Sequence, residues 1–166
     1  MNIPKAIELA FAAVLRQYAE LGKDVLVRAW QSLSDDPNWD ANVDRQFPIV
    51  DCRCSPPQVD QTQSTMSVEV KLLCGTKGED DKDHAIISAI YEAVSDLCDT
   101  LFSQFKNQQF GADEIKAFLA SLNANLDPTV FQFGGFTYGM GHPPANIGGI
   151  NMIGITMVVH YGRPDC

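Results

Sequence analysis

Cysteine and histidine are the residues of this sequence whose types could support metal, redox or nucleophilic chemistry. Cys52 and Cys54 flank a single residue, so on a strand their thiols would lie on one side, about 6.6 Å apart, at the long end of disulfide geometry. Cys74 and His84 could complete a zinc site with them, but structural zinc ligands usually come from knuckles with two or more intervening residues. We therefore interpret the cysteines as small apolar side chains of the core and predict no metal and no cofactor.

Nucleophilic catalysis would need one of these thiols beside His84 or His160 and a carboxylate, and no motif brings such residues together. The sequence has neither nucleophile-elbow spacing nor a phosphate-binding Gly-x-x-x-x-Gly-Lys loop. The acidic cluster at 79–83 lacks the ligand spacing, central glycine and closing glutamate of an EF-hand loop, and it suits a helix N-terminus. The sequence therefore predicts a protein that is not an enzyme.

Hydrophobic spacing predicts the elements that must position these residues. Apolar residues at three-and-four spacing indicate helices, and apolar residues in alternation or in short β-branched runs indicate strands. The segment Pro56–Gln63 is predicted to be a polar connection. The predicted helices are Pro4–Leu21, Val25–Leu33, Lys82–Phe105 and Asp113–Leu122, and the predicted strands are Phe47–Cys54, Ser64–Cys74, Thr129–Tyr138 and Ile150–Tyr161.

This order, α(α)ββα(α)ββ, predicts the α+β class. The economical assembly is a four-stranded, mainly antiparallel sheet with the helices packed on one face. A chain of 166 residues fits one domain, spanning 1–166, with surface loops at 34–46, 106–112 and 139–149.

Composition excludes several classes of protein. With 45% hydrophobic and 20% charged residues, the chain is not expected to be disordered as a whole. Its net charge of −9 disfavours both tight binding of a nucleic-acid backbone and binding to an anionic membrane surface. The N-terminal pattern indicates an amphipathic helix and not a signal peptide, and five cysteines without framework spacing suit a reducing compartment, so we expect a cytoplasmic site of synthesis.

The loop 139–149 combines features of a connector and of an interaction arm. Its glycines allow movement, Pro143 and Pro144 stiffen its tip, and Met140 and Ile147 are apolar side chains that need a surface to cover them. Both interpretations stay open, and a partner would order the loop under the second. Together with aromatic residues beside predicted loops, it gives the predicted protein interface: Trp30, Trp39, Tyr138, Met140, His142, Pro143, Pro144 and Ile147.

A succession of segments resembles the tail-terminator (tail-completion) proteins of tailed bacteriophages and their relatives among neck proteins. The segments are FPIVDCRCSPP, STMSVEVKLLC, DDKDHAIISAIYEAVSDLCDTL, VFQFGGFTYG and INMIGITMVVHY. The resemblance runs from about residue 5 to residue 162 and departs from the family pattern at 106–125 and 139–149.

The resemblance implies a structural virion protein. Members of this family form a ring, usually of six copies, that ends the tail tube and joins the tail to the head or neck. The implied partners are further copies of the chain, the tail tube protein and a neck or head-completion protein, with phage DNA passing through the lumen without specific binding and no membrane involved. The implied location is the virion, after assembly in the host cytoplasm. A neck adaptor, a small-ligand-binding module and a cysteine-dependent enzyme stay open as alternatives.

Overall fold

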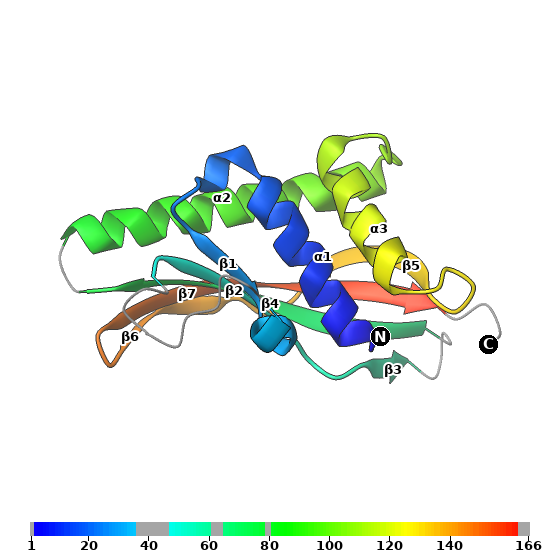
Figure 1. The fold of residues 1–166 in the computed structure, drawn as a ribbon, viewed down its shortest axis with the longest axis horizontal. Coiled ribbons are helices and arrows are strands. Elements are labelled where there is room, and N and C mark those ends of the chain that lie inside the picture. The colour runs from blue at the N-terminus through cyan, green and yellow to red at the C-terminus, as the bar shows by residue number, and fades with distance from the viewer. Residues whose placement is uncertain (1, 36–46, 61–64, 79–80, 163–166) are drawn as a thin grey trace.

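The structure is a computed structural model that describes residues 2–35, 47–60, 65–78 and 81–162. In these residues, three α-helices lie over one face of a twisted sheet, and the other face carries no α-helix (Figure 1). The elements are α1 (Ile3–Gln17), η1 (Ala19–Leu21), β1 (Leu26–Ala29), η2 (Trp30–Asp35), β2 (Ile49–Cys54), β3 (Gln58–Asp60), β4 (Thr65–Lys77), α2 (Asp81–Lys106), α3 (Asp113–Asn125), β5 (Gln132–Tyr138), β6 (His142–Ile147) and β7 (Ile150–Gly162).

The two longest strands, β4 and β7, form an antiparallel pair at the centre of the sheet, and their register runs from Met66 opposite Tyr161 to Lys77 opposite Ile150. The strand order is β1-β2-β4-β7-β5, with β3 beside the start of β4 and β6 beside the start of β7. The pair β1–β2 is parallel, and the other pairs are antiparallel.

Alternation along β4 and β7 separates a buried face from an open one. The residues that point toward the helices are almost fully buried, whereas their neighbours are partly exposed or polar. The buried set is Val68, Val70, Leu72 and Cys74 on β4 and Val159, Met157 and Ile155 on β7, with the partly buried Ile153 opposite Cys74.

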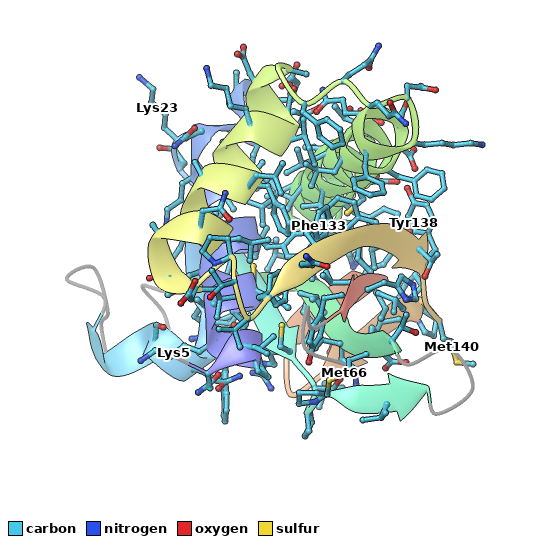
Figure 2. The ribbon with its side chains drawn as sticks, turned by 90° about the vertical axis from the view of Figure 1, so that its right-hand side faces the viewer. Lys5, Lys23, Met66, Phe133, Tyr138 and Met140 are labelled. Carbon is cyan, nitrogen blue, oxygen red and sulfur yellow. The ribbon has the colours of Figure 1, made fainter. Side chains whose placement is uncertain are left out.

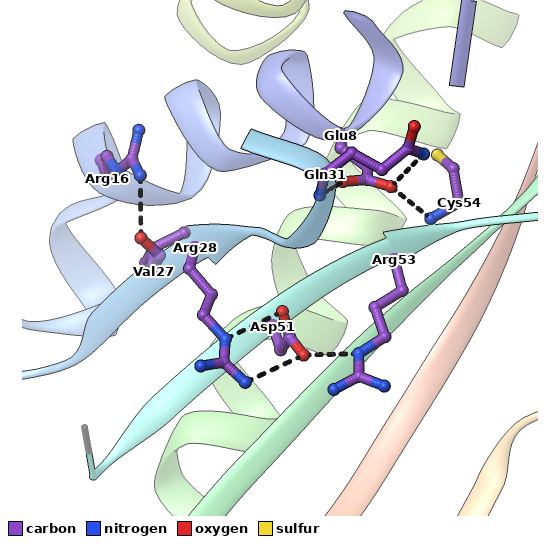
Figure 3. Close-up of polar contacts among 8 residues, drawn as sticks. All are labelled: Glu8, Arg16, Val27, Arg28, Gln31, Asp51, Arg53 and Cys54. Carbon is purple, nitrogen blue, oxygen red and sulfur yellow. Dashed lines mark hydrogen bonds and ion pairs between the residues drawn. The ribbon is translucent and has the colours of Figure 1, made fainter. Parts of the chain in front are cut away.

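Helix α1 is fixed at both its start and its middle. The Asn2 side chain accepts a hydrogen bond from the Lys5 backbone N–H at 2.7 Å, as an N-cap does. The fully buried Glu8 carboxylate accepts from the Gln31 N–H and from its side-chain amide, both at 2.7 Å, and from the Cys54 N–H at 2.9 Å (Figure 3). The Glu8 side chain therefore connects α1 to η2 and β2. The three N–H groups that donate to it replace the hydrogen bonds to water that the carboxylate loses on burial.

Phenylalanine rings fill the space between the helices and β5. Phe118 of α3 contacts Phe11 of α1 and Phe136 of β5, with ring centroids 5.0 and 5.1 Å apart. At the bulge in β5, Gly135 has φ +108°, and a Cβ there would lie 2.5 Å from Cε1 of Phe105. Only glycine allows this close approach of strand and helix.

The α+β class is confirmed, but the four-stranded, mainly antiparallel sheet is wrong, because the sheet is mixed and has seven strands. The predicted helix Val25–Leu33 is also wrong. Its residues form β1 and η2, since Val27 and Ala29 pack beneath α1 while β1 pairs with β2. Short apolar segments fit helix and strand spacing alike, and tertiary pairing decides between them.

The other two missed strands carry little hydrophobic pattern. The short strand β3 lies in the predicted connection Pro56–Gln63, and its Val59 is 61% exposed. The strand β6 occupies most of the predicted loop 139–149, and its prolines are tolerated because β6 pairs with β7 alone.

The long periodic elements agree with expectation. The predicted helix Lys82–Phe105 corresponds to α2, and the predicted strand Ile150–Tyr161 corresponds to β7. The predicted loop 106–112 is the link from α2 to α3, whereas 36–46 of the predicted loop 34–46 lies outside the described residues. Within the described ranges, no helix has the length and apolar character that crossing a membrane requires.

Candidate interaction surfaces

Most of the predicted interface residues lie on one structured extension, residues 138–147, which we name the β6 arm. Met140 is 88% exposed, Ile147 66% and Tyr138 45%. Figure 2 shows Met140 at the outer margin of the molecule, beyond the end of β5. Ladder pairing with β7 holds Tyr138, His142 and residues 145–147, so paired backbone presents Ile147 to solvent, and Met140 lies between two paired stretches.

Tyr138 anchors the start of the arm to α2. Its hydroxyl donates a hydrogen bond to Asp99, and its ring lies 5.6 Å from that of Phe102. Burial raises the pKa of the Tyr138 phenol well above its usual value, and the hydrogen bond and charge of Asp99 act in the same direction. The neutral phenol is therefore the state that the fold stabilises.

The tip of the arm has few groups that could extend the sheet. Pro143 and Pro144 are exposed and have no N–H to donate to a further strand. His142 is half-buried beside Gly154 of β7, and its Nε2 has no hydrogen-bond partner among the described residues. A partner would therefore meet mostly side chains at this edge and not a complete ladder of backbone groups.

A groove of about 450 Å³ runs between the N-terminal half of α2 and the hairpin of β6 and β7. Ile87 and Tyr91 form its α2 wall, and Pro144, Met152 and Ile153 form its strand wall. The groove therefore includes part of the arm, at Pro144.

A buried polar network closes the end of this hairpin. Asn151 is 5% exposed and donates to the Gly78 carbonyl at 2.7 Å and to Thr76 Oγ1 at 3.4 Å. It accepts from the Asn146 side chain at 2.8 Å. The network joins β6, β7 and the end of β4, so it fixes the position of the β6 arm.

Trp30 lies far from the β6 arm, on a second surface at the β1 side of the sheet. It is 51% exposed, and the Arg53 guanidinium carbon lies 5.7 Å from the centre of its ring. The Asp51 carboxylate accepts a hydrogen bond from Arg53 Nε at 2.6 Å and forms an ion pair with Arg28, whose Nε lies 3.1 Å away (Figure 3). Trp39, the other tryptophan of the predicted interface, lies outside the described residues.

Sequence reasoning missed Arg53 and Asp51 as members of this second surface. The available signal is the charged Asp51 between the buried Val50 and Cys52, because a charge within an apolar run needs a partner. The register of β1 against β2 then places Arg28 beside Asp51, which spacing alone does not reveal.

Four cysteines in the described ranges are free thiols, at positions 52, 54, 74 and 98. Burial raises the pKa of all four, to about 12 for Cys74, so their neutral forms dominate near neutral pH. Among the described residues, no group of three or more His, Cys, Asp or Glu side chains is placed to hold a metal ion.

A second groove of about 800 Å³ lies along α1 and α3, and small residues such as Ala13 and Ala117 line it. Glu20, Asp113 and Glu114 line it. Burial, followed by the charges of Glu20, Asp96 and Glu114, raises the pKa of the nearby Tyr18 phenol. Carboxylates from η1, α2 and α3 thus gather on the helix side of the molecule.

No family model matches this sequence, and no curated protein sequence matches it.

Proposed function

We propose that this chain is the subunit of a ring, of six copies, that ends the tail tube of a tailed bacteriophage and joins the tail to the head or neck. The family resemblance supplies the setting and the copy number. The β6 arm is the observation that supports a role in protein assembly, and the tail tube protein and a neck or head-completion protein are its proposed partners.

The β6 arm favours assembly because it presents large apolar side chains to solvent. Covering Met140 and Ile147 would remove apolar surface from water, which stabilises a complex by about 1.5–3 kcal/mol for each fully buried side chain. The backbone at Ile147 is already held by pairing with β7, so covering this side chain costs less conformational entropy than ordering a flexible loop would. Exposed apolar groups beside a groove are typical of protein interaction sites.

Charge supports the proposed passage of DNA through the ring. Six copies, each with a formal charge of −9, would repel a polyanion at long range and at low salt. The same charge opposes closure of the ring, and salt shortens its range to about 10 Å at 0.1 M. We therefore expect rings to be favoured by moderate salt or by contact with the tail tube, and we expect no retention of DNA.

Native mass and electron microscopy test the proposal. Sedimentation across a salt series, with and without tail tube protein, is expected to give a closed oligomer, and negative stain is expected to show rings that cap tube ends. The double variant Met140→Ser/Ile147→Ser is expected to cap fewer tubes. The control is Val130→Ser, which removes an apolar side chain that is 50% exposed in the turn after α3, and it is expected to behave as the wild type.

A monomer under every condition, or tight binding of duplex DNA by the isolated chain, would contradict the proposal. Binding to portal-side rings but not to tube ends would favour the neck adaptor. Equal capping by the double variant and the control would mean that the β6 arm is only a connector.

The groove beside α2 favours a second candidate, a small-ligand-binding module. Its volume of about 450 Å³ lies within the range of about 300–1,000 Å³ that is usual for ligand pockets. Tyr91→Trp would fill this groove, and it should abolish any ligand-induced rise in melting temperature while leaving ring formation intact. A rise that persists in this variant would exclude the groove as the ligand site.

A further inference from the structure

The open face of the sheet, the one without helices, carries a positively charged patch on β1, β2 and β4. By register, Arg28 lies beside Asp51, and Arg53 lies directly opposite Lys71. Figure 1 shows this face as the underside of the sheet. An unpartnered sheet face with ordered charges is a candidate docking surface.

Within this patch, buried Asp51 holds two guanidinium groups in place. Its side chain is 5% exposed, and its oxygens lie 2.6 Å from Arg53 Nε and 3.1 Å from Arg28 Nε. The Arg53 side chain remains 45% exposed and stacks on Trp30. Because Trp and Arg on rigid supports are the residues most often found at the energetic centre of protein interfaces, this pair has the composition of a docking site.

Lys71 adds an exposed positive charge beside Arg53. Like charges directly opposite each other on neighbouring strands destabilise a sheet, and Arg53 faces Lys71 in this way. Asp51 is shared between two arginines, and Glu69 lies two residues from Lys71 on the same strand. An external carboxylate over Arg53 and Lys71 would relieve the repulsion.

The opposite side of the same molecule carries such carboxylates. Glu92, Asp96 and Asp99 are exposed along the outer stripe of α2, at spacing that places them on one helix face. Glu20 and Glu114 lie close enough to Tyr18 for their charges, with that of Asp96, to act on its phenol. The helix side is therefore acidic where the open face of the sheet is basic.

We infer that, in the assembled protein, the open-face patch around Trp30, Arg53 and Lys71 of one copy binds the acidic α2 face, around Glu92 and Asp96, of the next copy. This inference rests on the proposed function and identifies the two surfaces that the ring joins. The two surfaces differ and lie on opposite sides of the subunit, so the contact is heterologous, as any closed ring of more than two copies requires.

A second copy fits the patch better than a nucleic acid does. The whole chain has a net charge of −9, which repels a polyanion as it approaches, whereas the next copy offers a local set of carboxylates on a rigid helix. The planar guanidinium of Arg53 also matches carboxylate geometry. Salt then acts in two ways: moderate salt screens the long-range repulsion between copies, and high salt weakens the local pairs.

Charge reversal tests the pairing of the two surfaces. Lys71→Glu and Asp96→Lys, both at exposed positions, are each expected to raise the concentration for half-assembly by about tenfold or more. The combined variant Lys71→Glu/Asp96→Lys reverses both surfaces and is expected to recover most of this loss. Lys23→Glu and Asp24→Lys, which make the same charge changes in the exposed turn before β1, are the controls and are expected to assemble as the wild type.

Sedimentation velocity in about 0.1 M salt gives the half-assembly concentration, and circular dichroism establishes that each variant is folded. If a charge reversal perturbs folding, the neutral pair Lys71→Gln and Asp96→Asn is expected to show a smaller loss in the same direction. A wild-type oligomer whose assembly neither reversal changes would overturn the inference and leave the proposed function standing.

Three further outcomes are informative. Failure of the combined variant to recover would overturn the pairing, because two independent defects would then add. Duplex DNA bound by the wild type and lost in Lys71→Glu would assign the patch to nucleic acid and overturn the inference. A wild type that stays monomeric under every condition would overturn the proposed function together with the inference.

Discussion

The two ends of the central β4–β7 pair are built differently. At one end, which we name the aromatic end, α1, α3 and β5 enclose the rings of Phe11, Phe118 and Phe136. At the other, the arm end, α2 and the β6–β7 hairpin leave a groove and two exposed apolar side chains. The first end has its stabilising contacts inside the subunit, and the second leaves apolar surface for contact with another molecule. Stability and assembly should therefore respond to substitutions at different ends.

The largest effect is expected at the aromatic end. Phe118 is fully buried, and replacing it with alanine would leave a cavity beside Phe11, Phe133 and Phe136. Phe118→Ala should lower the free energy of unfolding by about 3–5 kcal/mol, as measured by urea denaturation. Phe110→Ala, at a ring that is 46% exposed, is the control and should cost much less. A loss below that of the control would show that the aromatic cluster does not hold this end together.

A smaller effect is expected in the polar network of the arm end. Asn151→Ala removes the donor to the Gly78 carbonyl and the acceptor for Asn146, and it should cost about 1–3 kcal/mol. Faster amide hydrogen exchange is expected across β6, because Asn151 ties β6 to the end of β4. Exchange that increases equally in β6 and in α3 would mean that the two ends do not respond independently.

The smallest effect is expected where β5 passes into the β6 arm, and it depends on pH. Folding raises the pKa of Tyr138 above its usual value of 10.0, so the neutral phenol is favoured in the folded state. Its contribution is present below pH 10 and is lost as the pH rises through the unfolded and then the folded pKa. Tyr138→Phe should therefore lose stability less steeply than the wild type above pH 10 in denaturation curves. Parallel curves would exclude this contribution.

Sequence patterning predicted the parts of the fold whose stability comes from regular burial. The helix α2 and the strands β4 and β7 carry long apolar stripes, so their periods are clear. The strands β3 and β6 were missed because pairing at an edge, and not a buried face of their own, defines them. The strand β1 was missed although Val27 and Ala29 are buried, because its short apolar pattern fits a helix equally well. These three strands account for the difference between the seven-stranded sheet and the predicted four-stranded one.

The candidate surfaces were predictable to different degrees. Met140 and Ile147 stand out in the sequence because each is apolar in a segment rich in glycine and proline, and the structure places both in the exposed set. The Trp30–Arg53 pair depends on how β1 and β2 align across the intervening segment, which no local pattern specifies. Trp30 was predicted from the sequence to be an interface residue, whereas the contact of Arg53 with Trp30 is visible only in the structure.

The pairing of β4 with β7 also sets the order in which the polypeptide can fold. The strand β4 ends at Lys77 and its partner begins at Ile150, so the ladder joins segments separated by α2 and α3. Contacts of such high sequence separation slow folding, because the loop must close before the ladder stabilises it. During synthesis, β2 and β4 can pair early, while the other edge of β4 stays without its partner until β7 has left the ribosome. The nascent chain therefore carries an open apolar strand until its last strand emerges, a period in which a chaperone would improve its yield.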